Sequence, residues 1–279
     1  ASEMQGWGAV FSKVTAPLGV YSVFGNHDYG DYVIWESQAI KQQNLKDLAA
    51  IHRQMGWDLL INENRILEVE GEKLAVLGVE NWGAKARFPK YGKLDLAVKN
   101  TEDTAFKILL SHDPSHWQAE VLTKYPTIDL TLSGHTHGMQ FGVEIPGFKW
   151  SPVQYMYKEW AGLYKSNEQF LYVNRGFGYL GYPGRVGILP EISVLTLERV
   201  GSMRKNPPSM LLTSSISMEY FIPYMERHSL PWERKAKEMG LPLQYSEKNE
   251  WIPLKNYSLF IKEMSLLSNE DMPICVGRD

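Results

Sequence analysis

Three short stretches of the chain carry side chains that bind metal ions: Gly25-Asn26-His27-Asp28, Ser111-His112-Asp113-Pro114 and Gly134-His135-Thr136-His137-Gly138. Imidazole is a common ligand of zinc, iron and nickel ions. His135 and His137 stand two residues apart, and side chains at that spacing project to the same side of extended backbone. The spacing therefore predicts that both imidazoles face one point or two neighbouring points. An isolated motif of this kind is equally typical of a turn with two solvated histidines.

Each of these stretches follows a run of residues typical of a buried strand. The runs are residues 19–24, 106–110 and 128–133. Ligands of α/β sheets gather at the carboxyl ends of the strands. Three adjacent strands would therefore bring Asn26, His112 and His135 to one edge of a sheet, and the arrangement predicts a shared metal or catalytic site there.

The remaining pattern is that of an α/β protein. Helical spacing of apolar residues predicts helices over residues 5–17, 35–55 and 115–124. Two strand-like runs, 65–70 and 73–80, flank a Glu70-Gly71-Glu72 turn and predict a hairpin. Loops are expected over 83–101 and 141–164, and strands over 170–173 and 192–197 would complete the sheet.

Composition excludes some classes of function. The chain has 279 residues, a formal net charge of -3 and a single cysteine, Cys275. A charge near zero without a basic surplus predicts no nucleic-acid binding. One cysteine excludes an internal disulfide framework. No apolar run approaches the roughly 20 residues that span a bilayer.

The three motifs, in this order and at this spacing, resemble those of the calcineurin-like metallophosphoesterases over residues 1–199. Gly138-Met139-Gln140 and the segment from Arg185 to Ile192 are similar to a branch of small bacterial phosphoesterases that are often attached to membranes. The resemblance implies an α/β fold class, a metallophosphoesterase-type β-sandwich flanked by helices. It also implies hydrolysis of phosphomonoesters or phosphodiesters. The implied substrates are small-molecule, lipid-linked or cell-envelope phosphoesters, with membrane-surface association of the parent protein and a bacterial cytoplasmic or membrane-associated location.

The resemblance also assigns roles to residues. It implies two divalent ions, Mn, Fe or Zn, the first bound by Asn26, His112 and His135 and the second by His137. Two such ions activate a bridging hydroxide and clamp the phosphoryl oxygens.

Two neighbouring residues would be catalytic. His27 would contact the substrate phosphate or protonate the leaving oxygen, and Asp28 would orient His27 and raise the pKa of its ring. Arg175 and Arg185 could bind the substrate phosphate, since the guanidinium fork suits phosphoryl oxygens. An ordinary place in a loop is an equal alternative for both arginines.

The chain departs from the family pattern before residue 25. The family has an Asp-x-His motif and a Gly-Asp motif there, whereas residues 1–24 contain no aspartate and no histidine. We therefore expect a chain truncated at its amino end, which binds at most one metal ion weakly and hydrolyses phosphoesters with impaired activity. The alternative is a non-catalytic binding or structural module that retains the fold.

Other histidines and aromatic residues have simpler interpretations. His116 is expected to be solvated or to start a helix rather than to bind metal, and His52 and His228 are interpreted in the same way. An aromatic cluster could form a lip facing lipid or substrate, but packing of a long loop on the core is the favoured interpretation. The cluster consists of Trp150, Tyr155, Tyr157, Trp160 and Tyr164.

Composition changes after residue 200. We expect a metallophosphoesterase domain over 1–200, a linker over 201–214 and a small all-α segment over 215–279. Residues 215–277 resemble the start of the sensing domain of AraC-type transcription regulators, which implies small-molecule sensing. No helix-turn-helix follows, so no DNA binding is inferred. A helical tail that folds back on the sheet is the alternative.

Overall fold

The computed structural model describes residues 1–85, 88–145, 148–197 and 237. The chain divides into two compact units. Unit 1 consists of Ala1–Met139 and Pro152–Gly176, and unit 2 consists of Gln140–Ser151 and Phe177–Asp279. The predicted linker over 201–214 lies outside the described residues, as does nearly all of the predicted helical segment over 215–279. The domain boundaries therefore stay a prediction.

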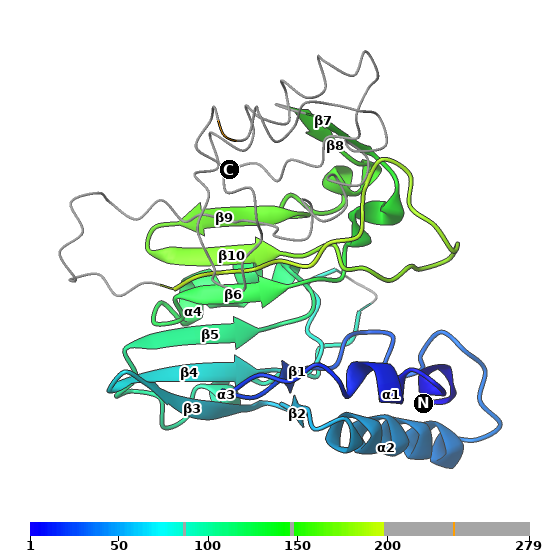
Figure 1. Ribbon diagram of the computed structural model, residues 1–279, viewed down its shortest axis with the longest axis horizontal. Helices are drawn as coiled ribbons and strands as arrows, with labels where there is room; N and C mark the ends of the chain where they lie inside the picture. The colour runs from blue at the N-terminus through cyan, green and yellow to red at the C-terminus, as the bar shows by residue number, and fades with distance from the viewer. Residues whose placement is uncertain (86–87, 146–147, 198–236, 238–279) are drawn as a thin grey trace. The chain divides into compact units, whose positions relative to one another are not determined.

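Unit 1 is built on one six-stranded sheet in the order β3-β4-β5-β6-β10-β9 (Figure 1). The central strands β4, β5, β6 and β10 are parallel, and the edge strands β3 and β9 are antiparallel to their neighbours. The carboxyl ends of four strands therefore meet at one edge of the sheet. The strands are β3 (Glu63–Val69), β4 (Glu72–Gly78), β5 (Phe106–Leu110), β6 (Leu130–Ser133), β9 (Gly162–Ser166) and β10 (Gln169–Val173).

The predicted hairpin is present as β3 and β4. Its turn residues, Glu70 and Gly71, both have positive φ angles, 52° and 81°. This pair of angles is typical of the tight turns whose twist matches antiparallel strands. The local sequence of the turn therefore sets the register in which β3 and β4 pair.

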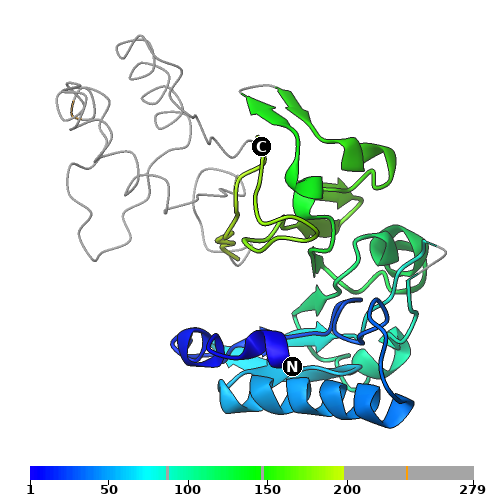
Figure 2. The same ribbon diagram turned by 90° about the vertical axis from the view of Figure 1, so that its right-hand side faces the viewer.

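The helices of unit 1 are mostly short. The predicted helix over 35–55 is present as α2, which runs along the lower edge of unit 1 (Figure 2) and begins after Ser37, whose hydroxyl accepts a hydrogen bond from Ile40 N. The predicted helix over 5–17 is reduced to a single turn. The helices are α1 (Gly8–Phe11), α2 (Gln38–Gln54), α3 (Leu94–Ala97) and α4 (Leu122–Lys124). Single turns and a π-helical segment complete them: η1 (Ser2–Met4), η2 (Trp117–Val121), η3 (His137–Gln140) and η4 (Pro152–Tyr155).

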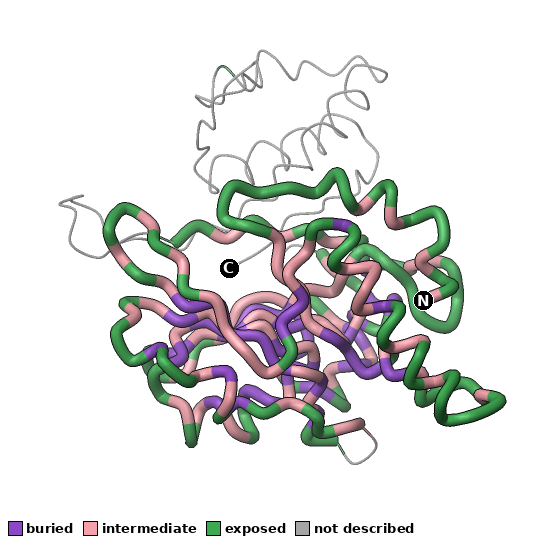
Figure 3. The backbone as a smooth tube through the Cα atoms, turned by 90° about the horizontal axis from the view of Figure 1, so that it is seen from below, coloured by how far each residue is buried: buried purple, intermediate pink, exposed green. Residues whose placement is uncertain are grey.

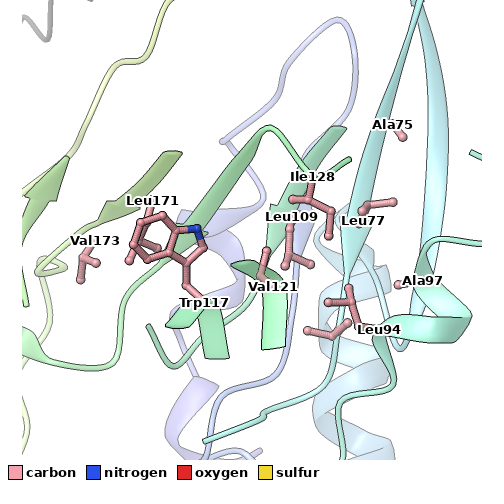
Figure 4. Packing of buried hydrophobic residues seen from close by; sticks show 11 residues of the cluster. Ala75, Leu77, Leu94, Ala97, Leu109, Trp117, Val121, Ile128, Leu171 and Val173 are labelled. Carbon is pink, nitrogen blue, oxygen red and sulfur yellow. The ribbon is translucent and has the colours of Figure 1, made fainter. Parts of the chain in front are cut away.

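One face of the sheet carries the main hydrophobic core. The short helix α3 and the segment η2 cover this face, and Trp117 belongs to the same buried cluster as Leu171 (Figure 4). Buried residues run along the central strands, whereas most loops are exposed (Figure 3). The core consists of Ala75, Leu77, Val79, Leu94, Ala97, Leu109, Trp117, Val121, Ile128, Leu171 and Val173.

A parallel pair of very short strands, β1 (Tyr21–Ser22) and β2 (Asp58–Leu59), forms a separate sheet. The pair packs on β4 at Gly78, where a β-carbon would lie 2.2 Å from Leu60 Cβ and 3.0 Å from Val23 Cγ1. The expectation that three adjacent strands carry the motifs is therefore wrong for the first of them. The α/β class is confirmed by the mixed sheet and helices, and in the described residues the second layer of the predicted sandwich is only this pair.

Unit 2 contains a small hairpin of β7 (Val143–Ile145) and β8 (Phe148–Trp150). The predicted loop over 141–164 is therefore wrong in part, since it contains this hairpin and the start of β9. The predicted strand over 192–197 is not formed in the described part of unit 2. An alternating sequence needs a partner to satisfy its backbone groups before it becomes a strand. No helix among the described residues is long and apolar enough to cross a membrane.

Candidate metal centre

Three side chains from distant parts of unit 1 meet at the carboxyl edge of the sheet. Asn26 Oδ1 lies 3.1 Å from His112 Nε2 and 3.0 Å from His135 Nδ1. The two imidazole nitrogens lie 3.3 Å apart. His112 follows β5 and His135 follows β6, which are neighbouring strands. The prediction that these three groups lie together is therefore matched by their geometry.

The first motif reaches this edge from the β1–β2 pair. Phe24 precedes the motif and is buried in a second core with Leu48 of α2 and Leu59 of β2. The motif then passes close to β5, because Gly25 lies directly against the His112 ring. Packing of α2 and of the β1–β2 pair therefore holds Asn26 beside His112.

The donor set fits a divalent cation. A cation bound at about 2.0–2.2 Å holds neighbouring ligand atoms about 3 Å apart, which matches the three distances. Burial, together with the nearby charges of His135, His137 and His27, lowers the pKa of His112 to about 3. The ring is therefore neutral near pH 7 and has a lone pair for a cation. Within the described residues no group of three or more His, Cys, Asp or Glu side chains could hold a metal ion; the third donor here is an amide.

The amide of Asn26 is held in one orientation. Its Nδ2 donates a hydrogen bond to Tyr32 Oη at 2.8 Å, which leaves Oδ1 towards the two imidazoles. Asn26 is also almost fully buried. An amide oxygen has lone pairs to offer, so this orientation presents an acceptor to the point where the rings meet.

The double-histidine turn is not extended. His135 and His137 have φ angles of 65° and 51°, and Met139 and Gln140, directly after the turn, also have positive φ. The prediction that both rings project from extended backbone is therefore wrong. Non-glycine residues rarely adopt this conformation, and such positions cluster at functional sites. His137 lies near enough for its charge to lower the pKa of His112.

The structure places His27 and Asp28 differently from the expectation. The His27 residue is exposed, and its ring packs against the Tyr32 ring in a tilted arrangement, with the centroids 4.4 Å apart. The Asp28 carboxylate accepts a hydrogen bond from Gly25 N at 2.6 Å and so stabilises the turn from Gly25 to Asp28. Partial burial lowers the pKa of His27, and Glu3 partly opposes this. The expectation that Asp28 raises the pKa of His27 is therefore not met, since the net shift is downward and Asp28 is not among its causes.

The two arginines lie in different units. Arg175 directly follows β10 in unit 1, where Asn174 N donates to Ser133 O at 2.8 Å, so it belongs to the same sheet edge as His135. Arg185 lies in unit 2, where its Nη2 donates to Gly178 O at 2.8 Å.

His116 starts η2 as expected, but its side chain is fully buried rather than solvated. Its Nδ1 lies 2.9 Å from Ser111 Oγ, and its Nε2 lies 3.3 Å from Glu120 Oε2. Burial lowers the pKa of His116 to about 4, although Glu120 and Asp113 act in the opposite direction. His116 therefore joins β5 to η2 and is no part of the donor set.

The buried His116 predicts loss of stability in acid. A folded-state pKa of about 4, below the 6.5 of an exposed histidine, means that the unfolded chain binds the proton more tightly. The free energy of unfolding should fall by a few kcal/mol as the pH drops from about 6.5 to about 4. In His116→Gln this decrease, measured by urea titration at several pH values, should be clearly smaller. An equal decrease in both proteins would contradict the assignment.

Sequence reasoning missed two residues of the site. Tyr157 Oη lies 2.9 Å from His135 Nε2 and 3.3 Å from Asp113 Oδ2. Tyr157 and Trp160 are buried, in agreement with packing as the favoured interpretation, whereas Tyr155 is 78% exposed. The alternative that this aromatic cluster forms a lip facing substrate was the signal that sequence reasoning had for Tyr157. Asp113 stands in a motif but had no assigned role.

Gly25 provides a test of how tightly the site is packed. A β-carbon at this position would lie 2.8 to 2.9 Å from three atoms of the His112 ring. Gly25→Ala should therefore displace the ring and weaken Mn²⁺ binding about 10-fold or more, by calorimetric titration. Gly134→Ala is the matched control, because its nearest atom is Asn174 O at 3.7 Å. Unchanged affinity in Gly25→Ala would contradict this geometry.

Comparison with known proteins agrees with the motifs. The sequence model of the family described as Calcineurin-like phosphoesterase matches residues 5–139. The uncharacterized metallophosphoesterase YkuE of Bacillus subtilis is 30% identical over 192 residues, which is 67% of this chain and 58% of that protein. Phosphodiesterase YaeI of Escherichia coli is 28% identical over 194 residues, 68% of this chain and 63% of its own length. A transmembrane protein with metallophosphoesterase domain of Danio rerio is 30% identical over 65% of this chain and 39% of its own length.

The chain thus spans between 39% and 63% of the lengths of these relatives. The comparisons give no support to the resemblance of residues 215–277 to AraC-type regulators, and those residues lie outside the described part apart from residue 237. The three motifs, the mixed sheet that positions two of them and the matched relatives all indicate the same family. The part of the chain that these matches cover is therefore similar to the calcineurin-like phosphoesterases.

Proposed function

We propose that this chain hydrolyses phosphoesters with the help of one divalent cation, Mn, Fe or Zn, held by Asn26, His112 and His135. The observation that supports the proposal is the convergence of these three donor atoms within 3.0 to 3.3 Å of each other. The similarity to calcineurin-like phosphoesterases supports the reaction class. His137 would serve a second cation, but residues 1–24 supply no aspartate or histidine to join it. We therefore propose one cation per chain and a rate below that of a two-metal enzyme.

Each residue of the site has a proposed task. When bound, the cation would polarise a phosphoryl oxygen and lower the pKa of a bound water. His27 is exposed beside Asn26 in the same loop, so its ring is free to approach the substrate and to pass a proton to the leaving oxygen. Arg175, at the same sheet edge, would bind a second phosphoryl oxygen through its guanidinium. The contact of Arg185 with Gly178 O supports a loop-fixing task for Arg185 instead.

The proposed substrates are small-molecule or lipid-linked phosphoesters. The name of one relative, phosphodiesterase YaeI, favours a diester. The name of another relative includes the word transmembrane, which supports association of the parent protein with a membrane surface.

The proposal is tested by hydrolysis of bis(p-nitrophenyl) phosphate and p-nitrophenyl phosphate. We expect release of p-nitrophenol that requires Mn²⁺, stops with a chelator and is lost in Asn26→Ala. Asn64→Ala is the matched control, because its amide bonds to Ala97 O and Lys99 O in another part of unit 1. Tight Mn²⁺ binding without hydrolysis of either ester would contradict the proposal and favour the non-catalytic module.

A further inference from the structure

We propose that Tyr157 and Asp113 are positioning residues that fix the tautomer of His135, so that its Nδ1 lone pair faces the cation site. The reason for fixing this tautomer rests on the proposed function. The hydrogen-bond geometry does not depend on that function, because Asp113, Tyr157 and His135 form a continuous chain of hydrogen-bonding groups. No sequence motif links Tyr157 to the site, and it stands 22 residues after His135.

The chain of hydrogen bonds begins at Asp113. This side chain is fully buried. Its Oδ1 accepts from Ser115 N at 2.8 Å and from Ser115 Oγ at 2.6 Å, and its Oδ2 lies 3.3 Å from Tyr157 Oη. A carboxylate only accepts hydrogen bonds. The single hydroxyl hydrogen of Tyr157 is therefore directed to Asp113.

This direction decides the proton on His135. Having given its own hydrogen to Asp113, the Tyr157 oxygen can only accept from His135 Nε2, which lies 2.9 Å away. A neutral imidazole carries one N–H. With that hydrogen on Nε2, the Nδ1 lone pair points to the place shared with Asn26 Oδ1 and His112 Nε2, at 3.0 and 3.3 Å. A metal-binding histidine needs this arrangement, with the other nitrogen donating to an outer partner.

The surrounding residues hold the ring in place. Phe88 packs edge-on against the His135 ring at 4.7 Å between centroids. Thr136 Oγ1 donates to Trp160 O at 2.7 Å and so ties the turn of His135 to the segment that carries Tyr157. Tyr157 is 5% exposed, so water does not compete freely for its hydroxyl. The hydrogen bond is therefore a fixed part of the site.

The tautomer can be measured in the metal-free chain. Two-bond ¹H–¹⁵N correlation spectra of chain labelled with ¹⁵N-histidine distinguish Nε2–H from Nδ1–H rings, and His135→Gln identifies the signal among the seven histidines. We expect Nε2–H at His135 in the native chain. Tyr157→Phe keeps the packed ring but should give a mixture of tautomers. In Asp113→Asn, Ser115 keeps the amide oxygen, so the amide donates to Tyr157, the hydroxyl turns to Nε2, and His135 should become Nδ1–H.

Cation affinity provides the second readout. By Mn²⁺ titration, Tyr157→Phe and Asp113→Asn should bind about 10- to 100-fold more weakly, the usual loss when an outer partner of a metal-binding histidine is removed. Tyr164→Phe is the matched control. Within the described residues the Tyr164 hydroxyl bonds to Trp160 and Ala161, so the affinity of this variant should not change. Circular dichroism of each variant checks the fold.

The outcomes separate this inference from the proposed function. An Nδ1–H ring in the native chain, or an unchanged tautomer in both Tyr157→Phe and Asp113→Asn, would overturn the inference that Tyr157 and Asp113 fix the tautomer of His135. A native chain that binds no Mn²⁺ would overturn the proposed function. The spectra of the metal-free chain would still show whether Tyr157 and Asp113 fix the tautomer of His135.

Discussion

His112→Ala should abolish detectable Mn²⁺ binding and Mn²⁺-dependent phosphoester hydrolysis. The His112 ring is the neutral, buried donor that contacts both other members of the set, at 3.1 Å from Asn26 and 3.3 Å from His135. Its loss removes a direct ligand, so the affinity should fall by more than the roughly 100-fold upper value for an outer partner. Calorimetric titration and the bis(p-nitrophenyl) phosphate assay measure the two effects.

His52→Gln is the control for that variant. His52 lies on α2 and its Nδ1 contacts Ser22 Oγ at 2.8 Å, so it touches none of the three donors. Affinity and rate should stay near those of the native chain. Retention of native affinity in His112→Ala would show that the cation is bound elsewhere and would remove the basis of the proposed function.

Trp117→Ala should lower the free energy of unfolding by about 3–5 kcal/mol. Trp117 is 2% exposed and lies at the centre of the core that joins η2 to the sheet. Removal of its ring leaves a cavity that the neighbouring strands cannot close, because they are fixed by their backbone ladders. Urea unfolding followed by circular dichroism measures the change.

The matched control is Trp7→Ala, since Trp7 is 56% exposed beside α1. Its effect should stay below about 1 kcal/mol. A loss of less than about 1 kcal/mol in Trp117→Ala would contradict the assignment of this cluster as the main core of unit 1. Trp117 lies close to the His112 motif in the sequence. The cation affinity of Trp117→Ala should therefore be measured on its folded fraction, so that unfolding is not mistaken for a lost ligand.

The sequence was sufficient where structure is set locally. The Glu70-Gly71 turn fixes the β3–β4 hairpin, and the apolar spacing over 35–55 fixes α2. Two of the motifs were also sufficient to bring His112 and His135 together, because residues that follow neighbouring parallel strands share an edge of the sheet.

Contacts between distant segments could not be predicted in this way. β1 forms a separate pair because Gly78 lets it pack across β4, which no local pattern shows. The left-handed backbone at His135 contradicts the spacing rule for extended chains. His116 is buried because its ring stacks on Trp82 at 4.5 Å between centroids. Its i, i+4 spacing to Glu120 was a signal that was not used. Tyr157 reaches the site only through the fold.

Diffraction at the manganese edge from crystals of the native chain soaked in Mn²⁺ tests the central claim most directly. The three-donor account predicts one strong anomalous peak per chain, at about 2.0–2.3 Å from Asn26 Oδ1, His112 Nε2 and His135 Nδ1. A peak bound by other residues, or no peak at a Mn²⁺ concentration that supports hydrolysis in solution, would contradict it.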